Sequence, residues 1–185
     1  DVYTGGNHIW DKKDINNIIQ QSERLIRPAN YPDPCPGRGF NVFRLGEVRI
    51  GVINISGCTY MEALNNPFLT FDEIWQNIHE RCDIICVDFH AEATSEKIAF
   101  GYYADGRANI VYGTHTHVQT ADERILKGGT GYLTDIGMCG PYDGVIGVDK
   151  EIIVKNFVTQ RRSRFEVAPG PVQLNGALFT LDDTT

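Results

Sequence analysis

The feature that most constrains the fold of this chain is an alternation of short, β-branched apolar runs with stretches of helical periodicity. The strand-like runs are residues 48–55, 84–87, 109–112 and 131–136. Between the first two runs, Ile74, Ile78 and Cys82 recur at the spacing of one helix face. Repeated alternation of strands with helices favours a layered α/β fold in which helices cover a sheet.

Residues that suit helix caps set the expected limits of two helices. Thr70 and Glu73 have the spacing of a capping box, which predicts Thr70 as the N-cap of the first helix. Thr94 or Ser95 is the expected N-cap of the second helix, which should extend to about Tyr103. Each helix lies between two strand-like runs, as the α/β interpretation requires.

Three further elements are expected along the rest of the chain. Asp149 is placed to cap a helix that contains Ile153 and Phe157. Residues 174–181 read as a late strand. Residues 31–40 are rich in proline and glycine and therefore read as a loop.

Composition narrows the class of protein. With 42% hydrophobic and 22% charged residues, the 185-residue chain resembles one soluble domain, which we expect to span residues 1–185. A net charge of −7 argues against non-specific binding to DNA or RNA. No apolar stretch approaches the ~18 residues of a membrane span. Five cysteines without a Cys-x-x-Cys pair indicate reduced thiols in a cytoplasmic protein.

Four of the five histidines come just after strand-like runs, with residues 1–4 read as a further run before His8. They are His8, His90, His115 and His117. If the strands are parallel neighbours, their carboxyl ends share one edge of the sheet, and this is where α/β proteins bind ligands. His79 differs from the others because it lies within a predicted helix, where it reads as a solvated side chain.

The segment Gly113-Thr114-His115-Thr116-His117 places two of these histidines two residues apart. In an extended strand, residues i and i+2 point to the same face, so both imidazoles should emerge in one direction. Two convergent imidazoles are a common way to hold a metal ion, although two ligands do not complete a site. The alternative is a pair of surface loop histidines.

Asn7 and several carboxylates are candidates for the remaining ligands. Asn7 could add a neutral carboxamide oxygen while His8, beside it, points elsewhere. The alternative is that the glycines before Asn7 form a simple tight turn. Dinuclear hydrolytic sites also need a bridging oxygen ligand, and no nearby acid is placed unambiguously to bridge. The acids considered are Asp88, Glu92, Glu96, Asp122 and Asp135.

The order of these motifs resembles that of a known enzyme superfamily. Gly6-Asn7-His8, then His90, then the segment 113–117 follow one another as in calcineurin-like metallophosphoesterases. The segments "GNHIWDKK", "DFHAEATSEK", "GTHTHVQTADERIL" and "TDIGMCGPYDGVIG" closely resemble the YmdB-like bacterial phosphodiesterase branch of that superfamily. The resemblance covers nearly the whole chain.

The resemblance implies a role for each residue of the motifs. Asn7, His90 and His115 would ligate one divalent transition metal ion, and His117 would ligate a second. The two ions would be iron, manganese or zinc. His8 would bind no metal and would donate a proton to the leaving oxygen. The implied fold is a calcineurin-like layered sandwich of two β-sheets flanked by helices.

The resemblance also implies a reaction and its partners. Members of the branch hydrolyse phosphodiesters, so the expected substrate is a cyclic nucleotide or another small phosphodiester. The sequence leaves open whether the preferred ester is 2′,3′-cyclic, 3′,5′-cyclic or linear. A homo-oligomer is expected from the family, with neither a stable nucleic-acid partner nor a membrane partner.

Two acidic motifs of the family, Gly-Asp-x-x-Gly and Gly-Glu-Asn, do not occur in the 185 residues. In the family these acids ligate and bridge the metals. Asp1 begins what reads as a strand already under way, so the chain is expected to be a fragment without the first β-α-β portion and the last strand of the fold. If the 185 residues were complete, the alternative is a catalytically silent metal- or nucleotide-binding module with a regulatory role.

Overall fold

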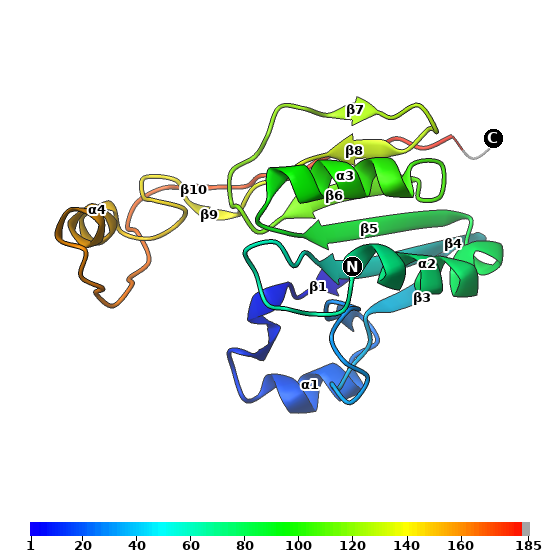
Figure 1. Ribbon diagram of the computed structural model, residues 1–185, viewed down its shortest axis with the longest axis horizontal. Coiled ribbons are helices and arrows are strands. Elements are labelled where there is room, and N and C mark those ends of the chain that lie inside the picture. Colours follow the sequence, from blue (N-terminus) through cyan, green and yellow to red (C-terminus); the bar gives the residue numbers. More distant parts are fainter. Residues whose placement is uncertain (183–185) are drawn as a thin grey trace.

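The computed structural model describes residues 1–182, and its centre is a six-stranded mixed sheet (Figure 1). The strand order is β3-β4-β5-β6-β8-β7. In that order, the strands are Phe40–Leu45, Val48–Ser56, Ile84–His90, Ile110–Thr114, Gly131–Leu133 and Arg124–Ile125. The strands β4, β5, β6 and β8 are parallel, and the edge strands β3 and β7 pair antiparallel. The expected α/β class is confirmed.

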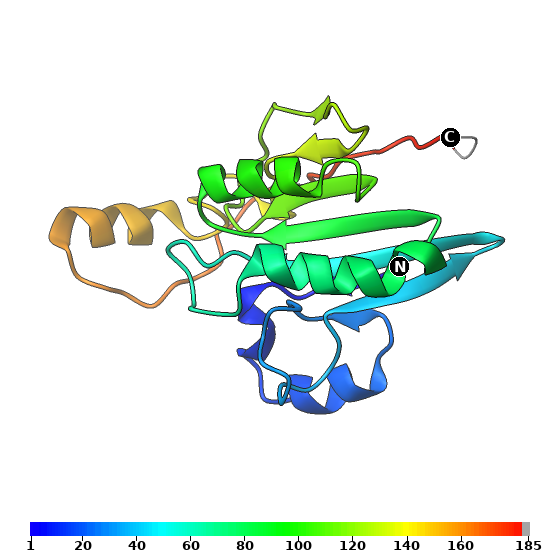
Figure 2. The same ribbon diagram turned by 45° about the vertical axis from the view of Figure 1, so that its right-hand side comes forward.

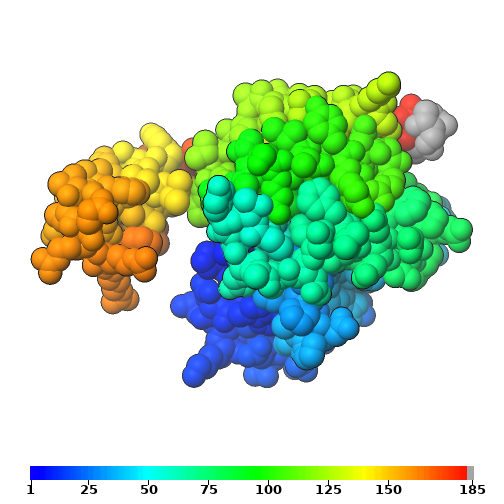
Figure 3. Space-filling model, viewed as in Figure 1, coloured from blue at the N-terminus to red at the C-terminus, as the bar shows by residue number. Residues whose placement is uncertain are grey.

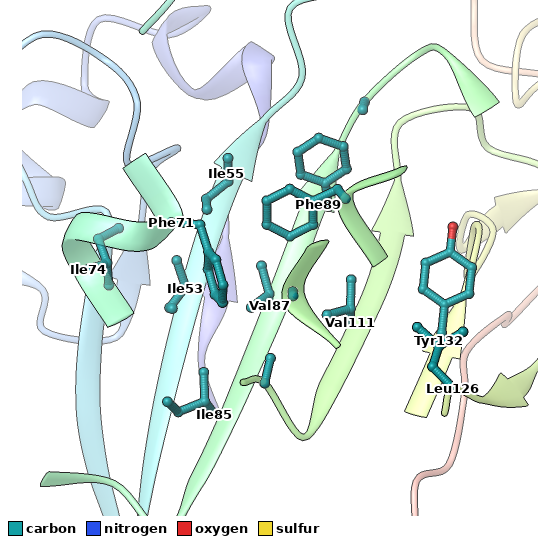
Figure 4. Packing of buried hydrophobic residues seen from close by; sticks show 14 of the residues in the cluster. Ile53, Ile55, Phe71, Ile74, Ile85, Val87, Phe89, Val111, Leu126 and Tyr132 are labelled. Atoms are coloured by element: carbon teal, nitrogen blue, oxygen red, sulfur yellow. The ribbon is translucent and has the colours of Figure 1, made fainter. Parts of the chain in front are cut away.

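Helices α2 (Pro67–Ile78) and α3 (Thr94–Ala104) cover one face of this sheet (Figures 1 and 2). The first connects β4 to β5, and the second connects β5 to β6. Their apolar faces pack on alternate residues of the central strands, because strand side chains alternate between the two faces (Figure 4). Phe89 of β5 stacks on Phe100 of α3 with ring centroids 4.2 Å apart. This core fixes the positions of the strand ends.

A small N-terminal unit lies beside the sheet. Its elements are β1 (Tyr3–Thr4), the 3-10 helix η1 (Asn7–Trp10), α1 (Ile15–Gln21) and β2 (Leu25–Ile26). The strands β1 and β2 pair parallel to each other. A second, smaller apolar cluster of Ile9, Ile19 and Tyr31 holds the unit together.

A third unit extends from the body of the molecule (Figures 1 and 3). It contains α4 (Lys150–Thr159), preceded by β9 (Gly140–Pro141) and followed by β10 (Val172–Gln173). The strands β9 and β10 form a two-stranded antiparallel sheet. Within residues 1–182, no helix combines the length and the apolar character that crossing a membrane requires.

The structure corrects two of the expected helix caps and confirms a third. The N-cap of α2 is Asn66, not Thr70, because Pro67 is favoured in the first turn and Asn66 Oδ1 accepts two backbone N–H bonds there. The helix α3 begins at Thr94 without a side-chain cap. Asp149 caps α4 as predicted, since its carboxylate accepts from two backbone amides of the first turn.

Two expected strands are shorter than their apolar patterns. The prediction of a late strand at 174–181 is wrong. The strand β10 ends at Gln173, and its pairing with the two-residue β9 extends no further in the described residues. The strand expected at 131–136 ends at Leu133. Asp135 instead turns into the protein, where it accepts hydrogen bonds from the backbone N–H groups of Thr116 and Gly137.

Candidate metal centre

The candidate site lies at the carboxyl ends of β5 and β6. These strands are parallel neighbours, and their register pairs the last residue of β5, His90, with the last residue of β6, Thr114. The N-terminal unit reaches the same edge, where the Gly6 N–H donates to Oδ1 of Asn54 in β4 at 3.3 Å. Gly6 has a φ of 59°, and a Cβ at this position would lie 2.5–2.8 Å from the His90 ring. The lack of a side chain lets Asn7 approach His90.

Three of the predicted ligands converge at this edge. His90 Nε2 lies 2.8 Å from Asn7 Oδ1 and 3.1 Å from His115 Nδ1. Donor atoms bound about 2.0–2.1 Å from one ion and at right angles to each other lie about 3 Å apart. The spacing of Asn7, His90 and His115 therefore fits a single metal ion, and their role as ligands stays a prediction.

Hydrogen bonds behind His90 determine which of its ring nitrogens carries the proton. Thr114 Oγ1 donates to Asp88 Oδ1 at 2.7 Å, so this hydroxyl can accept from His90 Nδ1, which lies 2.9 Å away. Nδ1 then carries the hydrogen, and Nε2 presents a lone pair towards Asn7 and His115. A hydrogen bond on the outer nitrogen is the usual device that orients a metal-binding histidine.

Asp88 is the buried anchor of this arrangement. Burial raises the pKa of Asp88 to about 6, and its hydrogen bonds with Thr4 and Thr114 oppose the rise. Asn54 Nδ2 also lies 3.2 Å from its carboxylate. A carboxyl group with this pKa is mostly ionised at pH 7, which favours the arrangement with the proton on His90 Nδ1. Acceptor atoms of Asn7 and His90 then face each other at 2.8 Å without a proton between them, and a cation would resolve this contact.

His115 is held from its other side by Glu92. His115 Nε2 lies 3.1 Å from Glu92 Oε2, so the Nε2–H donates to the carboxylate and Nδ1 is left towards His90. Burial lowers the pKa of His90 to about 3, and burial also lowers the pKa of His115. Both imidazoles are therefore neutral at pH 7, which is the form that binds metal.

His117 is placed differently from the sequence-based expectation. The strand β6 ends at Thr114, and His115 and His117 have φ angles of 95° and 67°. The two imidazoles therefore do not emerge in one direction from an extended strand. His117 Nδ1 donates to the Ile146 carbonyl at 3.2 Å, and within residues 1–182 its side chain makes no hydrogen bond to Asn7, His90 or His115. Its Nε2 keeps a free lone pair.

His8 takes no part in the hydrogen bonds that join Asn7, His90 and His115 within residues 1–182. Its side chain is 73% exposed, and its Nδ1 lies 3.0 Å from Asp11 Oδ2. Asp11 therefore fixes the hydrogen on Nδ1 and orients the ring. His8 is nevertheless close enough for its charge to lower the pKa of His90. This arrangement suits a proton donor beside the centre rather than a metal ligand.

The shortage of acids expected from the sequence is also seen in the structure. Within residues 1–182, no group of three or more His, Cys, Asp or Glu residues is placed to hold a metal ion. Of the acids considered, Glu92 contacts a candidate ligand directly, and the others bond to the surrounding framework. Asp88 bonds to Thr114, Glu96 to the amides of Cys58 and Thr59, Asp122 to Thr120 and Thr134, and Asp135 to Lys97 and Thr116.

A buried ion pair that the sequence reasoning missed supports the histidine loop. Lys97 of α3 and Asp135 lie 2.7 Å apart, and their side chains are 2% and 1% exposed. The Asp135 carboxylate also accepts from the backbone and the hydroxyl of Thr116, the residue between His115 and His117. Lys97 lies on the buried face of α3 with Phe100, which is the sequence signal that could have identified it.

The chain matches the YmdB-like protein family over residues 1–185. It is 50% identical over 185 residues to the 2′,3′-cyclic-nucleotide 2′-phosphodiesterase of Bacillus subtilis (strain 168). That alignment covers 100% of this chain and 70% of the relative.

Two solved structures resemble most of the fold. A hypothetical protein from Thermus thermophilus superimposes with a TM-score of 0.88 and 41% identity, over 93% of this chain and 67% of that one. A phosphatase from Mycoplasma pneumoniae superimposes with a TM-score of 0.83 and 38% identity, over 90% of this chain and 61% of that one. This chain therefore spans roughly two thirds of the length of the proteins that it matches.

Proposed function

The chain belongs to the YmdB-like protein family, and on that premise we propose that it is the histidine-bearing part of a metal-dependent phosphodiesterase that hydrolyses cyclic nucleotides. The observation that carries the proposal is the convergence of Asn7, His90 and His115 at one sheet edge, with donor atoms spaced for one ion. The 50% identity to a cyclic-nucleotide phosphodiesterase supports the same reaction class.

Asn7, His90 and His115 would hold one divalent transition metal ion, and His117 Nε2 is the free nitrogen that would contribute to a second position. When bound, such ions neutralise phosphate oxygens and lower the pKa of water, so that it attacks phosphorus at neutral pH. Burial keeps His90 and His115 neutral. Hydrogen bonds orient the imidazoles, to Thr114 for His90, to Glu92 for His115 and to the Ile146 carbonyl for His117.

His8 is proposed to protonate the leaving oxygen. Hydrolysis of a 2′,3′-cyclic ester at its 2′ bond adds a water oxygen to phosphorus and breaks the bond between phosphorus and the 2′ oxygen. The 2′ oxygen needs a proton, and the nucleoside keeps a 3′-monophosphate. His8 can supply that proton from Nε2, while Asp11 orients the ring through Nδ1. A positioned acid of this kind contributes ~10²–10⁴ in rate.

The experiment compares three histidine variants in the full chain. His115→Ala should lower bound metal and activity together, because it removes a proposed ligand. His8→Ala should retain metal and slow a 2′,3′-cyclic nucleotide ~10²–10⁴-fold, and it should slow a nitrophenyl ester much less because a phenolate leaves without a proton. His79→Ala is the matched control, since His79 stacks on Trp75 at the end of α2 and lies outside the proposed centre.

Elemental analysis of bound metal, run beside both activity assays, distinguishes the outcomes. Loss of metal from His8→Ala would contradict the assignment of His8 as an acid. Full metal content and full activity in His115→Ala would contradict the proposed centre. Metal binding in the unsubstituted protein without hydrolysis of any phosphodiester would favour the regulatory, catalytically silent alternative.

A further inference from the structure

A cavity of about 290 Å³ lies next to His117 and is not used by the proposed chemistry. The cavity lies between the histidine loop, the loop that follows β8 and the end of β10. Its lining residues are His117, Val118, Gln119, Met138, Pro141, Tyr142, Gly144, Ile146, Gly147, Gln173 and Asn175. In Figure 1, β9 and β10 lie between α4 and the carboxyl ends of β5 and β6. The cavity is therefore beside the edge of the sheet that carries the candidate metal centre.

We propose that this cavity binds the base of the nucleoside whose phosphate is hydrolysed at the centre. The inference rests on the proposed function and extends it from a phosphodiester to a nucleoside phosphodiester. The link between the two sites is His117, which forms part of the cavity wall and lies two residues after His115. Its Nδ1 bonds to the carbonyl of Ile146, another wall residue, so the cavity and the histidine loop are held together.

The charge of the cavity favours a base over a phosphate group. Its lining contains no Asp, Glu, Lys or Arg side chain among the described residues. An anionic phosphate would find neither a cation nor an ion pair there, whereas a neutral aromatic ring would lose little hydration. The volume lies at the lower end of the roughly 300–1,000 Å³ of ligand sites, which suits one base rather than a dinucleotide.

The side chains of the cavity offer both stacking and hydrogen bonds. The Tyr142 side chain is 59% exposed, and among the described residues its hydroxyl has no hydrogen-bond partner. A free aromatic face of this kind can stack on any base. The Gln173 carboxamide is likewise unpaired within residues 1–182, so it can donate to and accept from the edge of a base.

Two further carboxamides are already fixed in position. Gln119 Nε2 donates to the Gly176 carbonyl at 2.8 Å, and Asn175 Nδ2 donates to the Met138 carbonyl at 2.7 Å. Each keeps an amide oxygen that can accept from a ligand. Gly137 allows both to pack closely, since a Cβ there would lie 2.9 Å from Gln119 Cβ and 3.0 Å from Asn175 Cβ. Groups held in place in this way cost little entropy when a ligand binds.

The test uses Tyr142→Ala and Gln173→Ala in the full chain, with Tyr102→Ala as the matched control. Tyr102 is 60% exposed, close to the 59% of Tyr142, but lies on α3 outside the cavity. Calorimetry measures binding of adenosine 3′-monophosphate, the product of the proposed reaction, and of inorganic phosphate. Tyr142→Ala should weaken binding of the nucleotide about tenfold, because the stacking contact with the base is lost. The affinity for inorganic phosphate should stay unchanged. Tyr102→Ala should change neither affinity.

Kinetics provide the second measurement. For Tyr142→Ala, KM for 2′,3′-cyclic AMP should rise by a similar factor, whereas the kcat/KM for a cyclic phosphodiester of 1,2-propanediol, which has no base, should stay unchanged. Equal nucleotide binding and equal KM in the parent protein and in both cavity variants would overturn the cavity assignment and leave the proposed function intact. A parent protein that neither binds the nucleotide nor hydrolyses either ester would overturn both.

Discussion

Removing Lys97 should destabilise the protein more than any exposed lysine does, because Lys97 neutralises a carboxylate that water cannot reach. In Lys97→Met the side chain keeps its approximate length and loses its charge. Asp135 then keeps its hydrogen bonds from Thr116 and Gly137 but has no cation, and both partners of the pair are at most 2% exposed. Breaking a buried ion pair at one partner typically costs about 3–5 kcal/mol.

The position of the cost within that range follows from the hydrogen bonds that remain. Asp135 keeps three donors in Lys97→Met, so about 3 kcal/mol is expected for that variant. In Asp135→Ala the Lys97 ammonium keeps a single contact, to Thr116 Oγ1 at 3.5 Å, so the cost should approach about 5 kcal/mol. Both losses are smaller than or comparable to the total stability of a typical domain, about 5–15 kcal/mol.

The assay is urea unfolding followed by circular dichroism at pH 7 for each variant. Lys150→Met is the matched control, because Lys150 also pairs with an aspartate at 2.8 Å but both side chains are more than half exposed. That variant should unfold at nearly the same urea concentration as the parent. A Lys97→Met protein that loses less than about 1 kcal/mol would refute the argument that this pair is a buried structural charge. Lys97→Met should also weaken metal binding, since Asp135 holds the loop between His115 and His117.

Two other predictions follow from local geometry. Gly6→Ala should lower metal affinity and cost roughly 1–3 kcal/mol of stability. The new Cβ meets the His90 ring, and the backbone at φ 59° and ψ −164° lies in a region that essentially only glycine adopts. Unchanged metal content in elemental analysis would contradict this prediction. Burial raises the pKa of Cys86 to about 12, so at pH 8 its protonated thiol should resist alkylation until urea unfolds the chain. Exposed Cys139 should be alkylated at once. Mass spectrometry of labelled peptides measures both rates, and equal rates would contradict the prediction.

The periodic part of the fold was predictable because periodicity reports directly on burial. The run 48–55 became β4 and the run 84–87 became the start of β5. Their apolar residues alternate, so that Ile53, Ile55, Ile85 and Val87 are buried on the face that the helices cover. The absence of a strand at residues 174–181 was not predictable in the same way. Residues 174–181 carry apolar side chains, yet a strand also needs a neighbour to pair with, and sequence pattern alone does not supply that information.

The candidate site was predictable in its residue types and less so in its geometry. The rule that parallel strands end at one edge brought His90 and His115 together correctly. The rule of alternating strand faces failed for His117, because the chain leaves the strand at Thr114 and continues with positive φ angles. The supporting pair of Lys97 and Asp135 was missed because residues 38 positions apart share no local pattern.

The position of Asn7 on a separate unit has a consequence for how tightly the centre binds a cation. Asn7 is 83 residues away from His90, and its unit is held by a two-residue strand pair and a three-residue buried cluster rather than by the main core. Units with few buried contacts open locally while the rest of the protein stays folded. Each opening removes the Asn7 oxygen and breaks the hydrogen bond between Thr4 and Asp88, while β5 and β6 stay paired with each other. The apparent affinity is then the intrinsic affinity multiplied by the fraction of molecules in which the unit is docked, so a substitution far from the ligands, such as one at Ile19, can weaken metal binding through that fraction alone.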